Sequence, residues 1–163
     1  MAFFVNNPSV LKGFCPIGNK LCSNELSGIL ALAGPECEMK RRILIIEDER
    51  EISLILKLRL EAAGYEVVQS FDGEDGYDKA ATQKPDLILL DLILPRKGGL
   101  QILDELKADR RYKDIPVIII TGLAQDLDEV REGALKADGY FLKPFDSVEL
   151  LAAIKNRLKG GSS

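Results

Sequence analysis

Four apolar runs of this chain each end on a side chain that can take part in chemistry. The first run leads into Glu47 and Asp48, and the next three lead into Asp91, Thr121 and Lys143. If the runs are parallel strands, their carboxyl ends meet at one edge of a sheet, where open α/β sheets bind ligands. The spacing therefore predicts one site with three carboxylates, a hydroxyl and an ammonium group.

These groups together are suited to receiving a phosphoryl group. Crowded carboxylates repel one another, and Mg²⁺, which prefers oxygen ligands, relieves that repulsion. A hydroxyl at Thr121 and an ammonium at Lys143 can bind phosphoryl oxygens. Asp91 is the predicted nucleophile because it ends the central strand, while Glu47 and Asp48 are better placed to hold the metal. The alternative is a set of solvated acids in turns.

The composition excludes several other kinds of site. The chain has 163 residues, of which 46% are hydrophobic and 29% charged, as expected for one globular domain. It contains no histidine, which rules out histidine-based catalysis, histidine-ligated zinc and a phosphohistidine carrier. The net charge of -4 and a pI near 5.0 predict that no nucleic acid binds. No apolar stretch has the length of a membrane span.

The two ends of the chain differ from its middle. In residues 1–38, prolines and glycines interrupt the apolar runs. We predict that this segment is a disordered extension, or that the natural start is Met39. The folded domain is predicted to cover residues 39–159, and residues 160–163 are expected to form a flexible tail.

All three cysteines, Cys15, Cys22 and Cys37, precede the predicted domain. A zinc site made of cysteines alone needs a fourth thiolate, and an odd count does not indicate a disulfide framework. We interpret the cysteines as incidental, with a redox-sensing or metal-sensing tail as the alternative.

Short apolar segments predict five strands, at residues 43–46, 66–69, 87–90, 117–120 and 140–142. Three of the five are unbroken apolar runs, which is typical of parallel strands buried on both faces. Helix-length segments separate the strands. Strict alternation of five strands and five helices predicts a doubly wound α/β domain with three layers.

Apolar spacing and end signals place the helices. Stripes at helical spacing are formed by Ile52, Leu56 and Leu60, by Leu100, Leu103 and Leu106, and by Val148, Leu151, Ile154 and Leu158. Asp126 with Glu129, and Asp146 with Glu149, have the spacing of helix-capping pairs. Gly64 is expected to end the first helix.

Residues 40 to about 159 resemble the receiver domain of bacterial two-component response regulators. The resemblance rests on four segments in the order and at the separations typical of that family: Ile43–Glu49, Asp86–Pro95, Val117–Gly122 and Tyr140–Phe145. It implies a flavodoxin-like (CheY-like) sheet with strand order 2-1-3-4-5. It also implies a signalling module rather than an enzyme.

The resemblance assigns expected roles to the strand-end residues. Asp91 would be the phosphoacceptor, Asp48 would ligate Mg²⁺ directly, and Glu47 would act mostly through water. The backbone carbonyl of Ile93 would complete the protein ligands of the metal. Lys143 would bind the phosphoryl group or its acceptor carboxylate, and the peptide bond that follows it would be cis.

The resemblance further implies a switch and a slow loss of the phosphoryl group. Thr121 would turn toward the phosphoryl group and Tyr140 would rotate inward, changing the face made by the fourth helix, fifth strand and fifth helix. Ile93 and Leu123 would flank the path of the hydrolytic water. Because neither side chain can hydrogen-bond a water, we predict slow autodephosphorylation for this family.

The leading hypothesis is a single-domain response regulator in the cytoplasm. Its expected partners are a histidine kinase or histidine phosphotransfer protein upstream and an unknown protein target downstream, with no nucleic acid and no membrane. A monomer or a phosphorylation-dependent dimer is expected. The alternatives are a receiver fragment of a larger regulator or hybrid kinase, and a docking module that does not use phosphorylation. A haloacid-dehalogenase-type phosphatase normally has a second acid two residues after its nucleophile, where this chain has Ile93.

Overall fold

Five parallel strands form one sheet in the order β2-β1-β3-β4-β5, as the resemblance implies. The computed structural model describes residues 40–122 and 136–159. Its strands are β1 (Arg42–Ile46), β2 (Glu66–Ser70), β3 (Leu87–Leu90), β4 (Val117–Thr121) and β5 (Gly139–Leu142). The strand order reverses between β1 and β3, which is the position where doubly wound sheets bind ligands.

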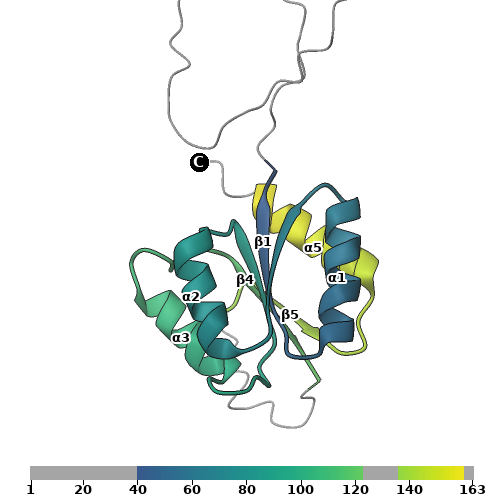
Figure 1. The fold of residues 1–163 in the computed structure, drawn as a ribbon. Coiled ribbons are helices and arrows are strands. Elements are labelled where there is room, and N and C mark those ends of the chain that lie inside the picture. The colour runs from purple at the N-terminus through teal and green to yellow at the C-terminus, as the bar shows by residue number, and fades with distance from the viewer. Residues whose placement is uncertain (1–39, 123–135, 160–163) are drawn as a thin grey trace, which may run out of the picture. The chain divides into compact units, whose positions relative to one another are not determined.

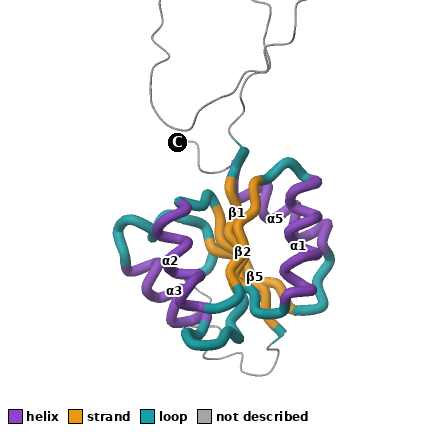
Figure 2. The backbone as a smooth tube through the Cα atoms, in the orientation of Figure 1, coloured by secondary structure: helices purple, strands orange, loops and turns teal. Residues whose placement is uncertain are grey.

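Helices cover both faces of the sheet. They are α1 (Arg50–Ala62), α2 (Gly73–Gln83), α3 (Gly99–Ala108) and α5 (Ser147–Lys159). Figures 1 and 2 show α2 and α3 on one face and α1 and α5 on the other, which is the predicted three-layer arrangement. The expected helix near Asp126 and Glu129, the three cysteines, Leu123 and the two chain ends lie outside the described residues.

The unbroken apolar strands are explained by two separate cores. In β1, Leu44 and Ile46 pack into the core beneath α2 and α3, whereas Ile43 and Ile45 pack into the core beneath α1 and α5. Consecutive residues of a strand point to opposite faces, so a strand covered on both sides must be apolar throughout. The central strands β3 and β4 alternate in the same way.

The apolar stripe of α5 differs from the prediction at one position. Val148 is 73% exposed, while Leu150 and Ile154 form the buried face. The helix begins at Ser147, so Val148 lies in its first turn, and the four-residue step from Leu150 to Ile154 keeps those two side chains on the sheet. The inclusion of Val148 in the core stripe was therefore wrong.

Two of the predicted helix boundaries, the end of α1 and the start of α5, are formed by the residues that the sequence indicates. Gly64, two residues after the last residue of α1, has a φ of 93°, a left-handed conformation that glycine adopts without strain. At the start of α5, Asp146 Oδ1 accepts a hydrogen bond of 2.6 Å from the backbone N–H of Val148. Within residues 40–122 and 136–159, no helix has the length and apolar character needed to cross a membrane.

Candidate functional site

The carboxyl ends of β1 and β3 bring three acids together. Because β1 and β3 pair in parallel, with Ile46 opposite Leu90, the residues that follow them emerge side by side. Carboxylate oxygens of Glu47, Asp48 and Asp91 lie within 4.8 Å of one another. The backbone supports this arrangement, since Asp91 N–H donates to the carbonyl of Ile46 at 3.0 Å.

The three acids differ sharply in burial. Glu47 and Asp91 are 1% and 4% exposed, whereas Asp48, the immediate neighbour of Glu47, is exposed. Two carboxylates are therefore held in a largely desolvated position, and the third faces solvent. Buried charges of one sign need a counter-charge or a proton.

Lys143 supplies that counter-charge from the loop after β5. Its Nζ lies 2.7 Å from Asp91 Oδ2 and 2.7 Å from Glu47 Oε2, and 3.5 Å from a carboxylate oxygen of Glu49. Its backbone N–H donates to the carbonyl of Thr121 at 2.8 Å, which continues the β4–β5 pairing into the loop. The peptide bond between Lys143 and Pro144 is cis, as the resemblance implies.

Burial and charge change the pKa values of this cluster. Burial, together with repulsion from Asp91, raises the pKa of Glu47 to about 7, although the hydrogen bond from Lys143 acts in the opposite direction. Burial alone would lower the pKa of Lys143, but hydrogen bonds to Asp91 and Glu47 raise it. Lys143 therefore remains an ammonium, and its charge is placed between two buried carboxyl groups.

Thr121 and Tyr140 lie on the same face of the sheet. In the register of the two strands, Tyr140 stands opposite Ile119, and Thr121 stands opposite Leu142. Ile119 and Tyr140 both pack in the core beneath α2 and α3, and Thr121, two residues after Ile119, has the same facing. Thr121 is fully buried and Tyr140 is half-buried.

The loop after β3 places Ile93 beside the acid at its start. The backbone N–H of Ile93 donates to Asp91 Oδ1 at 3.0 Å, while the Ile93 side chain is 53% exposed. Gly99 packs against the same segment: a Cβ at that position would lie 2.1 Å from the carbonyl oxygen of Asp91 and 2.6 Å from Cα of Leu92. Only glycine allows this approach without a shift of the backbone.

The comparisons with known proteins agree with this architecture. Residues 43–155 match the family model described as the response regulator receiver domain, which is more than half of the chain. The chain belongs to this family. The matched range lies within the predicted domain, residues 39–159.

Receiver domains in other proteins resemble this one in sequence and in structure. The chain is 43% identical over 118 residues to the DNA-binding dual master transcriptional regulator RpaA of Synechocystis, covering 72% of this chain and 49% of that protein. A receiver domain of a signal transduction histidine kinase from Syntrophus aciditrophicus is 32% identical, with a TM-score of 0.70, covering 75% of this chain and 92% of the other. The chain spans about half the length of the curated relatives it matches.

A third relative was solved with a metal ion and a beryllofluoride group bound. The response regulator TrrA of Thermotoga maritima, solved in complex with Mg²⁺–BeF, is 30% identical, with a TM-score of 0.64, covering 72% of this chain and 98% of the other. The family consists of signalling modules, and phosphorylation on aspartate with Mg²⁺ is a general feature of it.

Two hollows of the receiver domain lie in different places. An apolar groove of about 530 Å³ borders Lys143 and is lined by Ile52, Ile55, Leu56, Arg59 and Phe145, among others. A wider pocket of about 740 Å³ lies at the opposite edge, where the strands begin, and is lined by Lys40, Arg41, Arg42, Ala63, Gly64, Tyr65, Lys84 and Asp86.

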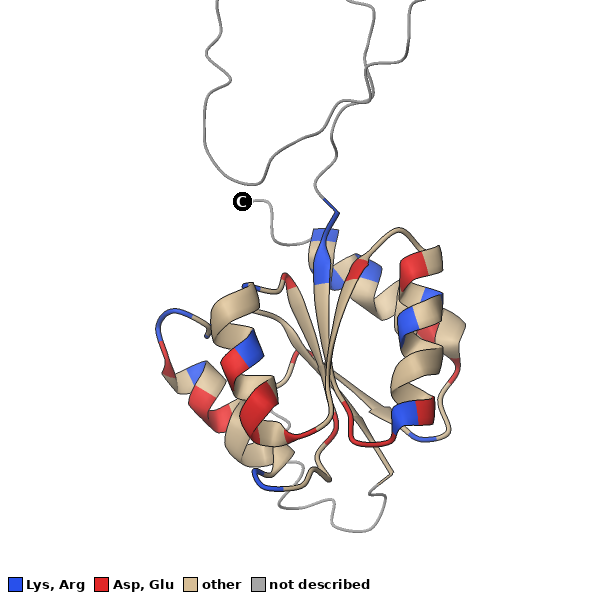
Figure 3. Ribbon diagram, viewed as in Figure 1, with Lys and Arg blue, Asp and Glu red and all other residues tan. Residues whose placement is uncertain are grey.

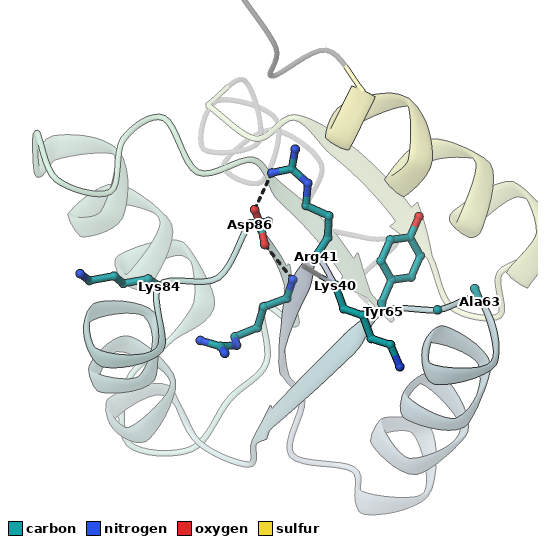
Figure 4. Close-up of a pocket in the computed structure, with 8 residues that line it drawn as sticks. Lys40, Arg41, Ala63, Tyr65, Lys84 and Asp86 are labelled. Atoms are coloured by element: carbon teal, nitrogen blue, oxygen red, sulfur yellow. Dashed lines mark hydrogen bonds and ion pairs between the residues drawn. The ribbon is translucent and has the colours of Figure 1, made fainter. Parts of the chain in front are cut away.

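The wider pocket is not part of the acid site. Figure 4 shows Arg41 paired with Asp86, and its Nη1 lies 2.8 Å from Asp86 Oδ1. The backbone N–H of Arg42 donates to Asp86 Oδ2 at 2.7 Å. Figure 3 shows basic residues at the start of β1 and acids in the loops at the other end of the sheet. The groove beside Lys143 is therefore the one of these two hollows that adjoins the acid cluster.

Sequence reasoning did not identify the contacts that shape the β3–α3 loop. It missed the close approach of Gly99 to Asp91 and the ion pair between Arg96 and Asp72. The adjacent pair Gly98 and Gly99, three residues after Pro95, was a signal for a turn with close backbone packing. No sequence pattern joins Arg96 to Asp72, because the contact exists only after folding.

Proposed function

We propose that this receiver, assigned to residues 39–159, accepts a phosphoryl group on Asp91 and thereby switches a protein-binding surface. The donor is a histidine kinase or a histidine phosphotransfer protein, and the reaction depends on Mg²⁺. One observation carries the proposal: the carboxylate of Asp91 lies 2.7 Å from Lys143 Nζ, and oxygens of Glu47 and Asp48 lie within 4.8 Å of its own.

The donor set of the acid cluster fits Mg²⁺. All three side chains offer carboxylate oxygens, and Asp48 faces solvent, which suits an ion that keeps several of its waters. In the proposed arrangement Asp48 and Asp91 bind the ion directly, Glu47 acts through water, and the carbonyl of Ile93 adds a backbone ligand. When bound, Mg²⁺ neutralises charge on the oxygens of the transferred group.

The proposed transfer needs a nucleophile and a fixed counter-charge. A carboxylate oxygen of Asp91 forms a bond to phosphorus while the bond from phosphorus to the donor's imidazole nitrogen breaks, and that nitrogen keeps the electron pair. Lys143 already donates a hydrogen bond to Asp91, so its ammonium can bind the phosphoryl oxygens with little movement. Thr121 donates its hydroxyl to the same group after transfer.

The proposed switch passes from Thr121 to the edge of the sheet. Thr121 and Tyr140 share one face of neighbouring strands, so movement of the threonine toward the phosphoryl group alters the space into which the Tyr140 ring can pack. The target then recognises a changed surface on β5 and α5. The helix expected in residues 123–135, which completes this face in the proposal, lies outside the described residues.

The groove beside Lys143 is the proposed docking face for the donor. On α1, the side chains of Leu54, Ile55 and Leu58 are each more than half exposed, and Ile55 also lines the groove. An exposed apolar patch that adjoins the acceptor suits a partner that must bring its phosphohistidine to Asp91. We propose that the donor protein covers this patch during transfer.

A phosphodonor assay tests the proposal. The protein is incubated with Mg²⁺ and a small acyl phosphate, and its intact mass is measured with and without hydroxylamine, which cleaves acyl phosphates. We expect a gain of one phosphoryl group that hydroxylamine removes. Asp91→Asn should abolish the gain, whereas Asp86→Asn, at the other edge of the sheet, should leave it unchanged. A gain that survives in Asp91→Asn would overturn the assignment.

A second candidate concerns the protein to which the receiver belongs. Because the chain spans about half the length of its curated relatives, and RpaA is named as DNA-binding, the receiver could serve as one part of a transcription regulator. The predicted absence of nucleic-acid binding therefore remains a prediction. The intact mass of the natively expressed protein distinguishes a single-domain regulator from a longer one.

A further inference from the structure

The loop between β3 and α3 makes its sharpest turn at Arg96. The backbone N–H of Lys97 donates to the carbonyl of Pro95 at 2.8 Å, so the turn closes over one residue. That residue, Arg96, has a φ of 67°. A side chain other than glycine adopts this conformation at a cost, and such strain persists only where surrounding contacts hold it.

Arg96 is held by the start of α2. Its guanidinium forms an ion pair with the carboxylate of Asp72 and lies 3.6 Å from a carboxylate oxygen of Glu74. The backbone adds a second link, because the N–H of Gly73 donates to the carbonyl of Pro95 at 3.4 Å. The turn is therefore attached to α2 through both a side chain and the main chain.

The side chain of Asp72 is itself held in place by burial and by hydrogen bonds. Its side chain is largely buried and caps α2 by accepting a hydrogen bond of 2.9 Å from the N–H of Asp75. The hydroxyl of Ser70 lies 2.6 Å from Asp75 Oδ2 and 3.0 Å from the carbonyl oxygen of Asp72, and the carbonyl of Ser70 accepts from the N–H of Glu47 at 3.0 Å. A continuous series of contacts thus connects Glu47 to the residue that binds Arg96.

The other end of the same loop reaches the acceptor. Ile93 lies three residues before Arg96, and its N–H donates to Asp91 Oδ1 at 3.0 Å. Next to the turn, Lys97 forms an ion pair with Glu105 and lies 4.3 Å from the ring centroid of Tyr77. Lys97 is thus held by α3 and α2, while Arg96 is held by the start of α2.

We infer that Arg96 is a positioning residue for the proposed Mg²⁺ site. Its ion pair with Asp72 keeps the strained turn closed and so fixes the backbone of Ile93 beside Asp91. This inference rests on the proposed function, in which the carbonyl of Ile93 is a metal ligand. Arg96 itself does not touch the metal.

The direction in which removal of Arg96 changes the Mg²⁺ affinity distinguishes a positioning role from a direct effect of its charge. A guanidinium near an acidic site repels Mg²⁺, so its removal would strengthen binding if charge alone mattered. If Arg96 positions the loop, its removal weakens binding instead. Exposed ion pairs are worth little, so we expect the dissociation constant for Mg²⁺ to rise about two- to fivefold in Arg96→Ala.

The test is calorimetric titration of the phosphate-free protein with Mg²⁺ at fixed ionic strength. Arg96→Lys keeps a cation that can pair with Asp72. We therefore expect this variant to bind Mg²⁺ more tightly than Arg96→Ala does. Arg111→Ala is the matched control: it removes an arginine that pairs with Asp109 in a similarly exposed position outside the loop. The control should bind Mg²⁺ at least as tightly as the parent.

A second measurement needs no metal. In the metal-free protein, hydrogen exchange of the Ile93 N–H should become faster in Arg96→Ala and stay unchanged in Arg111→Ala. Unchanged or tighter Mg²⁺ binding in Arg96→Ala, or unchanged exchange at Ile93, would overturn the inference while leaving the proposed function intact. A parent protein that binds no Mg²⁺ would overturn both.

Discussion

Lys143 Nζ lies 2.7 Å from Oδ2 of Asp91, although the two residues are 52 positions apart in the chain. The same ammonium also contacts Glu47, so one cation serves two buried carboxylates. The contact depends on β5 being paired with β4 and on that pairing continuing to Lys143, whose backbone N–H donates to the carbonyl of Thr121. The charge balance of the site is therefore a property of the assembled sheet.

Removal of this cation should destabilise the metal-free protein. In Lys143→Ala two buried carboxylates lose their partner, which we expect to cost about 3 kcal/mol of unfolding free energy at neutral pH. Mg²⁺ should restore part of the loss, so the midpoint of thermal unfolding should rise more with Mg²⁺ in this variant than in the parent. Lys155→Ala, which removes an exposed lysine of α5, serves as the control. Equal Mg²⁺ responses in all three proteins would contradict the prediction.

Glu47 should make the stability of the metal-free protein depend on pH. Its pKa is raised from 4.5 to about 7 by burial, so between these values the unfolded chain loses a proton that the folded protein keeps. Stability from this group is therefore fully present below pH 4.5 and is lost as the pH rises through 7, by on the order of 3 kcal/mol. Denaturant unfolding at pH 5 and pH 8 measures the loss. Glu47→Gln cannot ionise, so its unfolding free energy should fall less between pH 5 and pH 8 than that of the parent. Identical pH dependence in the two proteins would refute the role of Glu47.

The close contact at Gly99 should make that position intolerant of alanine. A Cβ there would meet the carbonyl oxygen of Asp91 at 2.1 Å, so Gly99→Ala must displace the backbone of the acceptor loop. We expect a loss of about 2 kcal/mol in unfolding free energy and slower phosphorylation. Gly98→Ala is the matched control, because no atom lies within 4 Å of a Cβ at that position. Similar stability of the two variants would show that the loop can shift freely.

Ile93 should slow the loss of the phosphoryl group. Its exposed side chain cannot hydrogen-bond a hydrolytic water, so Ile93→Asn should dephosphorylate faster than the parent. Because the side chain is 53% exposed, the substitution should change the unfolding free energy little. Decay of the phosphorylated intact mass over time gives both rates. If the parent loses its phosphoryl group as fast as Ile93→Asn does, the prediction is wrong. The second predicted position, Leu123, lies outside the described residues.

The hydroxyl of Thr121 should couple phosphorylation to Tyr140. Addition of Mg²⁺ with a beryllofluoride mimic should shift the Tyr140 ring resonances in the parent and in Thr121→Ser, which keeps the hydroxyl. In Thr121→Ala the shift should be lost while Asp91 still accepts a phosphoryl group. A full Tyr140 shift in Thr121→Ala would show that the ring responds by another route.

Much of the fold follows from local sequence patterns. The apolar runs that became β1, β3 and β4 needed no tertiary information, because a strand covered on both faces has to be apolar at every position. The end of α1 at Gly64 and the cap of α5 at Asp146 are also local, since each uses the backbone of its immediate neighbours. The α5 stripe was misplaced at Val148 because periodicity alone does not tell where a helix leaves the sheet.

The candidate site divides in the same way. The sequence alone determined which residue types follow which strands, and with them the expected chemistry of Glu47, Asp48 and Asp91. Tertiary structure decided that Glu47 is buried while Asp48 is exposed, that one lysine pairs with two acids, and that Arg96 binds Asp72. The physical reason is that burial and ion pairs depend on distances across the fold. The sequence around a residue does not indicate which distant residue it will contact after folding.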